Sequence, residues 1–162
     1  MLAVRRLAAA AHRRIAFVGS VDAQHPQFAE RYAGYAEELV RQGLTPTDPF
    51  PVPGDDRVEG GRRAVETLLA DKEPPDAIFA ANDAIALGVL EALARSGVAV
   101  PRVFGVVGFD GLAAGEHSNP PLTTIAPDFA EAGRVLVDRA TGGGSGPAPR
   151  IPVALVERAS VR

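Results

Sequence analysis

Residues 74–93 read PPDAIFAANDAIALGVLEAL and contain the clearest strand-to-helix transition of the chain. Asp76 to Ala80 form a short apolar run of strand length, and Asn82 then offers the side-chain oxygen of a helix N-cap. Asp83 places a negative charge at the positive end of the helix dipole, and the apolar periodicity continues to about Arg95. This stretch predicts a buried strand followed directly by a helix.

The same alternation extends along the whole chain. Apolar runs of strand length also occur at Ile15 to Gly19 and Val103 to Gly108, and a strand-like stretch at Ile151 to Val156. Prolines bracket a short segment from Leu122 to Ile125. Helical periodicity occurs at Pro26 to Gln42, Arg57 to Ala70 and Asp128 to Ala140. Alternating strands and helices predict right-handed crossovers, and therefore an α/β fold with a doubly wound, mainly parallel sheet flanked by helices.

Composition excludes several classes of protein. The 162 residues include 17 basic and 20 acidic side chains, so the net charge of −3 argues against a broad basic face for nucleic acid. The sequence has no cysteine, which excludes disulfides, thiolate metal sites and cysteine nucleophiles. No apolar stretch is long enough for a secretory signal or a membrane span, so we expect one cytoplasmic domain with no membrane contact.

Four polar residues are expected at one edge of the sheet, where the predicted strands end and the next helices begin. Asn82 and Asp83 follow one strand, Asp110 follows the next, and Arg31 lies in the second turn of the helix after the first strand. Ligands of open α/β sheets bind outside the carboxyl ends of the strands, and these groups could orient a small polar molecule. The structural alternatives are a helix cap for Asn82, a surface ion pair for Arg31 and a turn for Asp110.

Signals for catalysis are weak. The glycine-rich run from Gly142 to Pro149 lacks the lysine of a phosphate loop and predicts a flexible connector. Ser145 fails the nucleophile-elbow pattern because Pro147 replaces the second glycine. The three histidines are scattered, and only His25 lies at the predicted rim. We therefore expect no catalytic residue, no metal and no cofactor, and we include His25 among the ligand-binding candidates.

The helix after Asn82 is apolar over more than one face. Ile85, Ala86, Val89 and Leu93 form one stripe, and Leu87, Leu90 and Ala94 form another about 100° away. Such a helix requires burial on both faces. A subunit interface and deep burial within its own domain both satisfy this requirement.

Six stretches of the sequence resemble the effector-binding core of LacI/GalR-family transcriptional repressors, whose fold is that of type I periplasmic sugar-binding proteins. They are HRRIAFVGS at His12 to Ser20, RYAGY at Arg31 to Tyr35, Pro74 to Leu93 as quoted above, VPRVFGVVGFDG at Val100 to Gly111, PPLTTI at Pro120 to Ile125, and the closing VALVERASV. The resemblance covers nearly the whole chain and implies the carboxy-terminal lobe of this two-lobed fold.

The resemblance also implies a function and a set of site residues. It implies a regulator whose core closes on a small effector, often a sugar, and thereby changes its affinity for DNA. The positions matching Arg31, Asn82 and Asp110 contact the effector, and the position matching Phe129 lines the cleft. The helix matching residues 84–93 contributes to a homodimer, which favours the interface for Leu87, Leu90 and Ala94.

The domain organisation follows from the same resemblance. It assigns residues 15–125 and 150–160 to the carboxy-terminal lobe, and residues 1–13 and 126–147 to remnants of, or connections to, a missing first lobe. No helix-turn-helix is present, so DNA would be bound only through a missing N-terminal domain.

Three positions depart from the family pattern. Gly111 replaces a frequent acidic residue, Pro127 a polar cleft residue and Asp56 an aromatic one, so the identity of the effector is not implied.

Two other classes remain as alternatives. One is a solute-binding protein of a sugar import system, which a secretion signal on a longer precursor would favour. The other is a small flavodoxin-like or hydrolase-like α/β enzyme, which would require a nucleophile–base pair or a cofactor loop.

Overall fold

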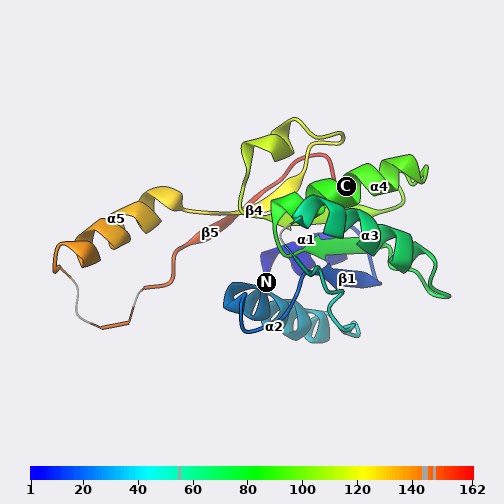
Figure 1. The fold of residues 1–162 in the computed structure, drawn as a ribbon. Helices are drawn as coiled ribbons and strands as arrows, with labels where there is room; N and C mark the ends of the chain where they lie inside the picture. The colour runs from blue at the N-terminus through cyan, green and yellow to red at the C-terminus, as the bar shows by residue number, and fades with distance from the viewer. Residues whose placement is uncertain (55, 144–145, 148) are drawn as a thin grey trace.

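The computed structural model describes residues 1–54, 56–143, 146–147 and 149–162. Its centre is a single sheet in the order β1-β2-β3-β4-β5 (Figure 1). The strands are β1 (Ile15–Val18), β2 (Ala77–Ala80), β3 (Gly105–Phe109), β4 (Thr123–Pro127) and β5 (Val153–Val156). The first four are parallel and β5 is antiparallel to β4. The predicted mainly parallel α/β sheet is therefore confirmed.

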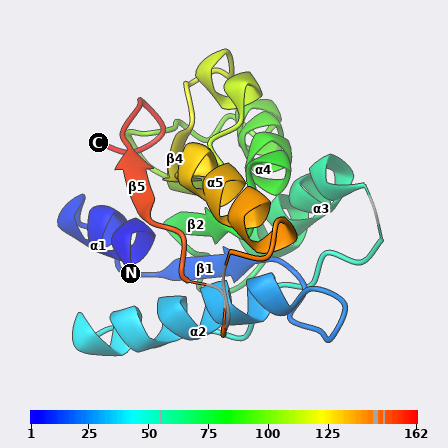
Figure 2. The ribbon, with the colours of Figure 1, turned by 90° about the vertical axis from the view of Figure 1, so that its left-hand side faces the viewer.

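Helices cover both faces of this sheet. They are α1 (Leu2–Ala9), α2 (Pro26–Arg41), α3 (Arg57–Leu69) and α4 (Asp83–Arg95). The chain also forms a short 3-10 helix, η1 (Ala113–Glu116), and α5 (Phe129–Ala140), which lies apart from the sheet (Figure 1). Helices α1 and α2 lie on one side of the sheet, and α3 and α4 lie on the other (Figure 2). All residues of β1 and β2 are buried between these two layers, as expected for strands that read as continuous apolar runs.

Helices α3 and α4 pack unusually closely because glycines face each other's backbone. A Cβ atom on Gly61 would collide with the carbonyl oxygen of Ile85, and one on Gly88 would collide with that of Val58. The buried residues of α3 are Gly60, Gly61, Ala64 and Val65, whereas its larger apolar residues Val58, Leu68 and Leu69 are only half-buried. Small residues at the contact bring the two helix backbones together.

This close packing accounts for much of the apolar surface of α4. Leu90 is only 3% exposed within its own domain, Leu87 is half-buried, and Ala94 is exposed. Of the three residues expected at a subunit interface, only Leu87 and Ala94 retain surface that a second subunit could cover. Burial within the domain is thus sufficient for Leu90.

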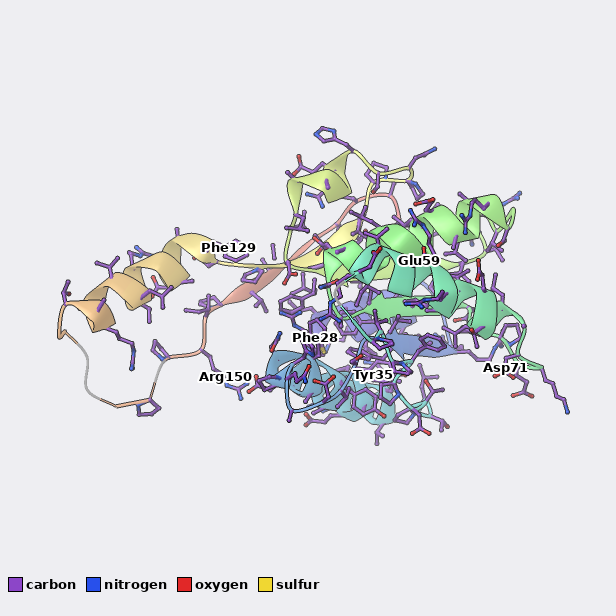
Figure 3. The ribbon with its side chains drawn as sticks, in the orientation of Figure 1. Phe28, Tyr35, Glu59, Asp71, Phe129 and Arg150 are labelled. Carbon is purple, nitrogen blue, oxygen red and sulfur yellow. The ribbon has the colours of Figure 1, made fainter. Side chains whose placement is uncertain are left out.

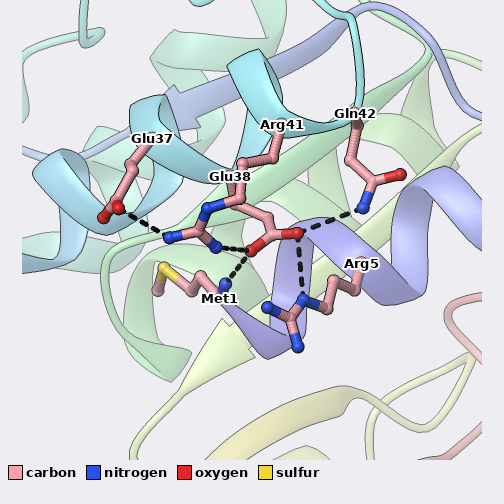
Figure 4. Close-up of polar contacts among 6 residues, drawn as sticks. All are labelled: Met1, Arg5, Glu37, Glu38, Arg41 and Gln42. Atoms are coloured by element: carbon pink, nitrogen blue, oxygen red, sulfur yellow. Dashed lines mark hydrogen bonds and ion pairs between the residues drawn. The ribbon is translucent and has the colours of Figure 1, made fainter.

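Residues 1–13, which the resemblance assigns to remnants of, or connections to, a first lobe, include α1, and α1 contributes to this core. Ala3, Val4 and Leu7 of α1 are completely buried, and α1 packs against α2. A buried carboxylate, Glu38, connects the two helices (Figure 4).

Glu38 is only 2% exposed and receives four polar contacts. Its oxygens accept from the Met1 ammonium at 2.5 Å, Arg5 Nε at 2.9 Å, Arg41 Nη1 at 2.7 Å and Gln42 Nε2 at 3.1 Å. These donors, led by the Arg5 hydrogen bond, hold the pKa of Glu38 far below its ordinary value.

The end of the chain forms an arm that leaves the sheet. The paired strands β4 and β5 extend beyond the other strands of the sheet, and α5 lies at the far end of this arm (Figure 1). None of the residues of α5 is buried, and Phe129, Leu136 and Val137 are 63%, 68% and 64% exposed. Of the predicted glycine-rich connector, Gly144, Ser145 and Ala148 lie outside the described residues.

Among the residues described, no helix has the length and apolar character needed to cross a membrane.

Candidate functional site

The carboxyl ends of β1, β2 and β3 form a rim at which three helices begin. Helix α2 starts after β1 and α4 after β2, while α3 follows a segment in which Phe50 pairs with Val18. Phe28 and Glu59, near the starts of α2 and α3, lie on the side of the arm, whereas Asp71 lies at the opposite end (Figure 3). The rim therefore faces the arm, and the partial positive charges of three helix N-termini are directed toward it.

Arg31 is held at this rim by several contacts. Its Nη1 donates to the Ala81 carbonyl oxygen at 2.5 Å, and its Nη2 lies 3.4 Å from Asp110 Oδ1. The guanidinium also stacks 3.6 Å from the centre of the Phe109 ring. With a side chain only 16% exposed, Arg31 is a positioned cation and not a mobile surface residue.

Asp110 occupies a backbone conformation that is rare for residues other than glycine. Its φ is +118°, and its backbone N–H donates to the Ile125 carbonyl oxygen at 2.9 Å. Burial raises the pKa of Asp110, and the adjacent Arg31 opposes this effect. At the next position, a Cβ atom on Gly111 would lie 2.8 Å from Ala126 Cβ, so the glycine is required by the path of the chain.

Asn82 and Asp83 lie side by side in the sequence but have different environments. Asn82 Oδ1 caps α4 by accepting from Ile85 N at 2.9 Å, and its amide nitrogen donates to no described residue. Asp83 is completely buried and accepts from Thr124 Oγ1 at 2.6 Å and Leu112 N at 2.7 Å. Its pKa is raised by burial. Asp83 therefore fixes the loop after β3, and of these two residues Asn82 is the one that retains hydrogen-bonding capacity for a ligand.

His25 belongs to a neighbouring cluster that contains an arginine the sequence analysis did not select. His25 Nδ1 lies 2.9 Å from Asp22 Oδ1, and His25 Nε2 lies 2.7 Å from Arg57 Nη2. The imidazole stacks on Phe28 with 5.4 Å between ring centres. Arg57 was missed because it is the first residue of a helix, a position at which an arginine carries no distinctive pattern.

Two groups of predicted residues lie apart from these contacts. Phe129 is on the arm and is 63% exposed, so this structure does not bring it to Arg31 (Figure 3). Leu87, Leu90 and Ala94 lie along α4 beyond its first turn, away from the capping residue Asn82.

A metal site or a cavity could also define a binding site among the described residues. Three or more His, Asp or Glu side chains placed for a metal ion do not occur among the described residues. A cavity of about 640 Å³ lies beside β1 and the segment 43–51 and is lined by Arg13, Phe17 and Leu68 among others. The chemistry that the rim side chains offer is that of hydrogen bonding and charge.

Comparison with known proteins places this geometry in context. Residues 4–161 match the family described as periplasmic binding protein-like domain. The HTH-type transcriptional repressor CytR of Escherichia coli K12 is 33% identical over 165 residues, covering 99% of this chain and 48% of the repressor. The ribose operon repressor of the same strain is 36% identical over 138 residues, covering 85% of this chain and 41% of that protein.

A solved structure shows the same relationship in three dimensions. The lac repressor dimer bound to operator and the anti-inducer ONPF superposes with a TM-score of 0.88 at 31% identity. The match covers 99% of this chain and 56% of that one. The chain thus spans about half the length of the curated relatives that it matches.

Proposed function

The chain belongs to the periplasmic binding protein-like domains that form the effector-binding part of LacI-type transcriptional regulators, and we propose that it senses a small polar metabolite such as a sugar. The observation that supports this function is the pairing of Arg31 with Asp110 beside the free amide group of Asn82. The named relatives are repressors, so we propose a regulatory role and not catalysis.

The rim offers both donors and acceptors to such a ligand. Two of the five guanidinium N–H groups of Arg31 are engaged with Ala81 and Asp110, which leaves three for the ligand. Asp110 and Asn82 add an acceptor and a donor in fixed positions. A molecule with several hydroxyl groups would satisfy all three side chains at once.

We propose that the arm completes the site from the other side. In this proposal residues 15–125 and 150–160 form the carboxy-terminal lobe, and residues 126–147 extend to a first lobe that covers the exposed face of Phe129 and Leu136. A ligand bound between two lobes stabilises the closed form only by its greater affinity for that form. DNA would be bound in the cytoplasm by a separate domain, whose affinity this equilibrium controls.

We also propose a homodimer that uses the remaining surface of α4. Leu87 and Ala94 would lie in the interface, and Leu90 would support them from the domain interior. A monomer mass by light scattering at micromolar concentration would contradict this arrangement.

A titration followed by backbone-amide NMR tests the proposed ligand site. Ribose, other sugars and nucleosides are added to the 162-residue chain and to the Arg31→Ala variant, with Arg63→Ala on the exposed face of α3 as control. We expect shifts around Arg31, Asn82 and Asp110, and at least about tenfold weaker binding in Arg31→Ala only. Unchanged affinity in Arg31→Ala, with shifts elsewhere, would refute the site.

A further inference from the structure

Arg57 is the one rim arginine that meets no described carboxylate. Its Nη1 donates to the Val52 carbonyl oxygen at 3.0 Å, and its Nη2 contacts His25 Nε2 at 2.7 Å. Neither partner is a carboxylate, and among the described residues Arg57 forms no ion pair with an Asp or Glu. The half-buried cation is therefore fixed in place without being neutralised by the described part of the chain.

The acidic groups near Arg57 are each engaged elsewhere. Asp22 pairs with His25, Asp110 pairs with Arg31, and Asp56 caps α3 by accepting from Glu59 N at 2.9 Å. Asp55 lies outside the described residues. None of these described carboxylates forms an ion pair with Arg57, so its guanidinium remains available to an anionic ligand at the junction of α2 and α3.

The hydrogen bonds of His25 fix the orientation of its ring in this arrangement. Because the Arg57 guanidinium can only donate, His25 Nε2 accepts, and the ring proton resides on Nδ1 and points to Asp22 Oδ1. His25 in this arrangement orients Arg57. The His25 ring and the Arg57 guanidinium both pack against the ring of Phe28. Because Phe28 is only 4% exposed, its ring holds both groups in position.

Three N–H groups of Arg57 have no hydrogen-bond partner among the described residues. A planar guanidinium fixed through two contacts is suited to bidentate binding of an oxyanion, since little side-chain entropy is left to lose. The positive N-terminal ends of α2 and α3 act in the same direction.

Resting on the function proposed above, we infer that the effector carries an anionic oxygen group, a phosphate or a carboxylate, which binds Arg57 while its polar body contacts Arg31, Asn82 and Asp110. Arg57 then determines specificity, and it distinguishes charged metabolites from neutral sugars of the same shape.

Matched ligands test this inference. Glucose, glucose 6-phosphate and glucuronate differ only at C6, and ribose with ribose 5-phosphate provides a second pair. Binding to the 162-residue chain is measured by NMR titration, with Arg57→Gln as the test variant and Arg63→Gln as a control of equal charge change on the exposed face of α3. The phosphate and carboxylate arms identify which oxyanion is preferred.

We expect at least one anionic ligand to bind about ten- to a hundredfold more tightly than its neutral counterpart. Arg57→Gln should abolish this difference, and Arg63→Gln should preserve it. Equal affinity for charged and neutral sugars, with shifts at Arg31 and Asp110, would overturn the inference and leave the proposed function intact. No shifts at the rim with any of the five ligands would contradict both.

Discussion

Replacing Asp83 with asparagine should destabilise the domain although the two side chains have nearly the same shape. Asp83 is completely buried and accepts hydrogen bonds from Thr124 Oγ1 and Leu112 N. An asparagine oxygen can retain the shorter bond to Thr124. Its amide group would then face the Leu112 N–H, so that two donors oppose each other.

The magnitude follows from the lost contact. A hydrogen bond to a charged acceptor contributes about 1.5–3 kcal/mol, and the buried Leu112 N–H would be left unsatisfied. Part of the lost free energy of unfolding is recovered because the variant no longer buries a charge. We expect a net loss of about 2 kcal/mol in the free energy of unfolding, or about 4–8 °C in Tm for a domain of this size.

The pH dependence has a defined sign. Burial raises the pKa of Asp83, so the folded state retains the proton at pH values where the unfolded state has released it. The contribution of Asp83 to stability is therefore largest at or below the ordinary pKa of about 3.9 and decreases as pH rises to the folded-state value. The difference between wild type and Asp83→Asn should increase as pH falls from 7 to 4.

Urea unfolding at pH 7, 5.5 and 4 measures these differences directly. Asp48→Asn, at an exposed position, is the matched control and should change stability by less than about 0.5 kcal/mol at each pH. If Asp83→Asn is as stable as wild type at pH 7, the carboxylate is a net cost and the reasoning from its hydrogen bonds is refuted.

Two further predictions concern the α1–α2 contact and the arm. Glu38→Gln should lower the free energy of unfolding by about 3 kcal/mol at pH 7. Because the pKa of Glu38 is lowered in the folded state, the ionised form provides this stabilisation, and the difference from wild type should shrink as pH falls below about 4.3. Chemical denaturation across pH measures it, and an equal loss in Glu37→Gln, whose side chain is 68% exposed, would contradict the explanation. Leu136→Ser should leave Tm within about 2 °C of wild type, because Leu136 is 68% exposed, whereas Leu93→Ala in the core should cost about 2–5 kcal/mol. Comparable losses in the two leucine variants, seen by calorimetry, would show that α5 packs against the domain.

The sequence predicted the sheet well because its parallel strands are buried on both faces. Apolar runs at residues 15–19 and 76–80 correspond closely to β1 and β2. The prediction was poorer where an apolar residue is not buried. Val103 was included in a predicted strand, but it is 58% exposed and lies in the turn before β3. The α3–α4 contact was missed because Gly61 and Gly88 contribute to packing by lacking a side chain, which an apolar periodicity does not register.

The common location of the candidate site residues was predicted in part, because it follows from the order of strands and helices. Arg31, Asn82 and Asp110 follow strands or lie near helix starts, so the topology alone places them at one rim. The burial of Asp83 depends on contacts with β4 that are remote in sequence, and Arg57 depends on a partner 32 residues away. Such contacts form between segments whose relative positions no local pattern specifies.

The backbone of Asp110 implies a conflict between stability and role. With φ at +118°, glycine would occupy this position with less strain than an aspartate, at a difference of order 1 kcal/mol or more. Mutational drift judged by folding alone would favour glycine here. If Asp110 binds the effector as proposed, a screen for stabilised variants should select glycine at this position, whereas a screen for ligand response should retain the carboxylate.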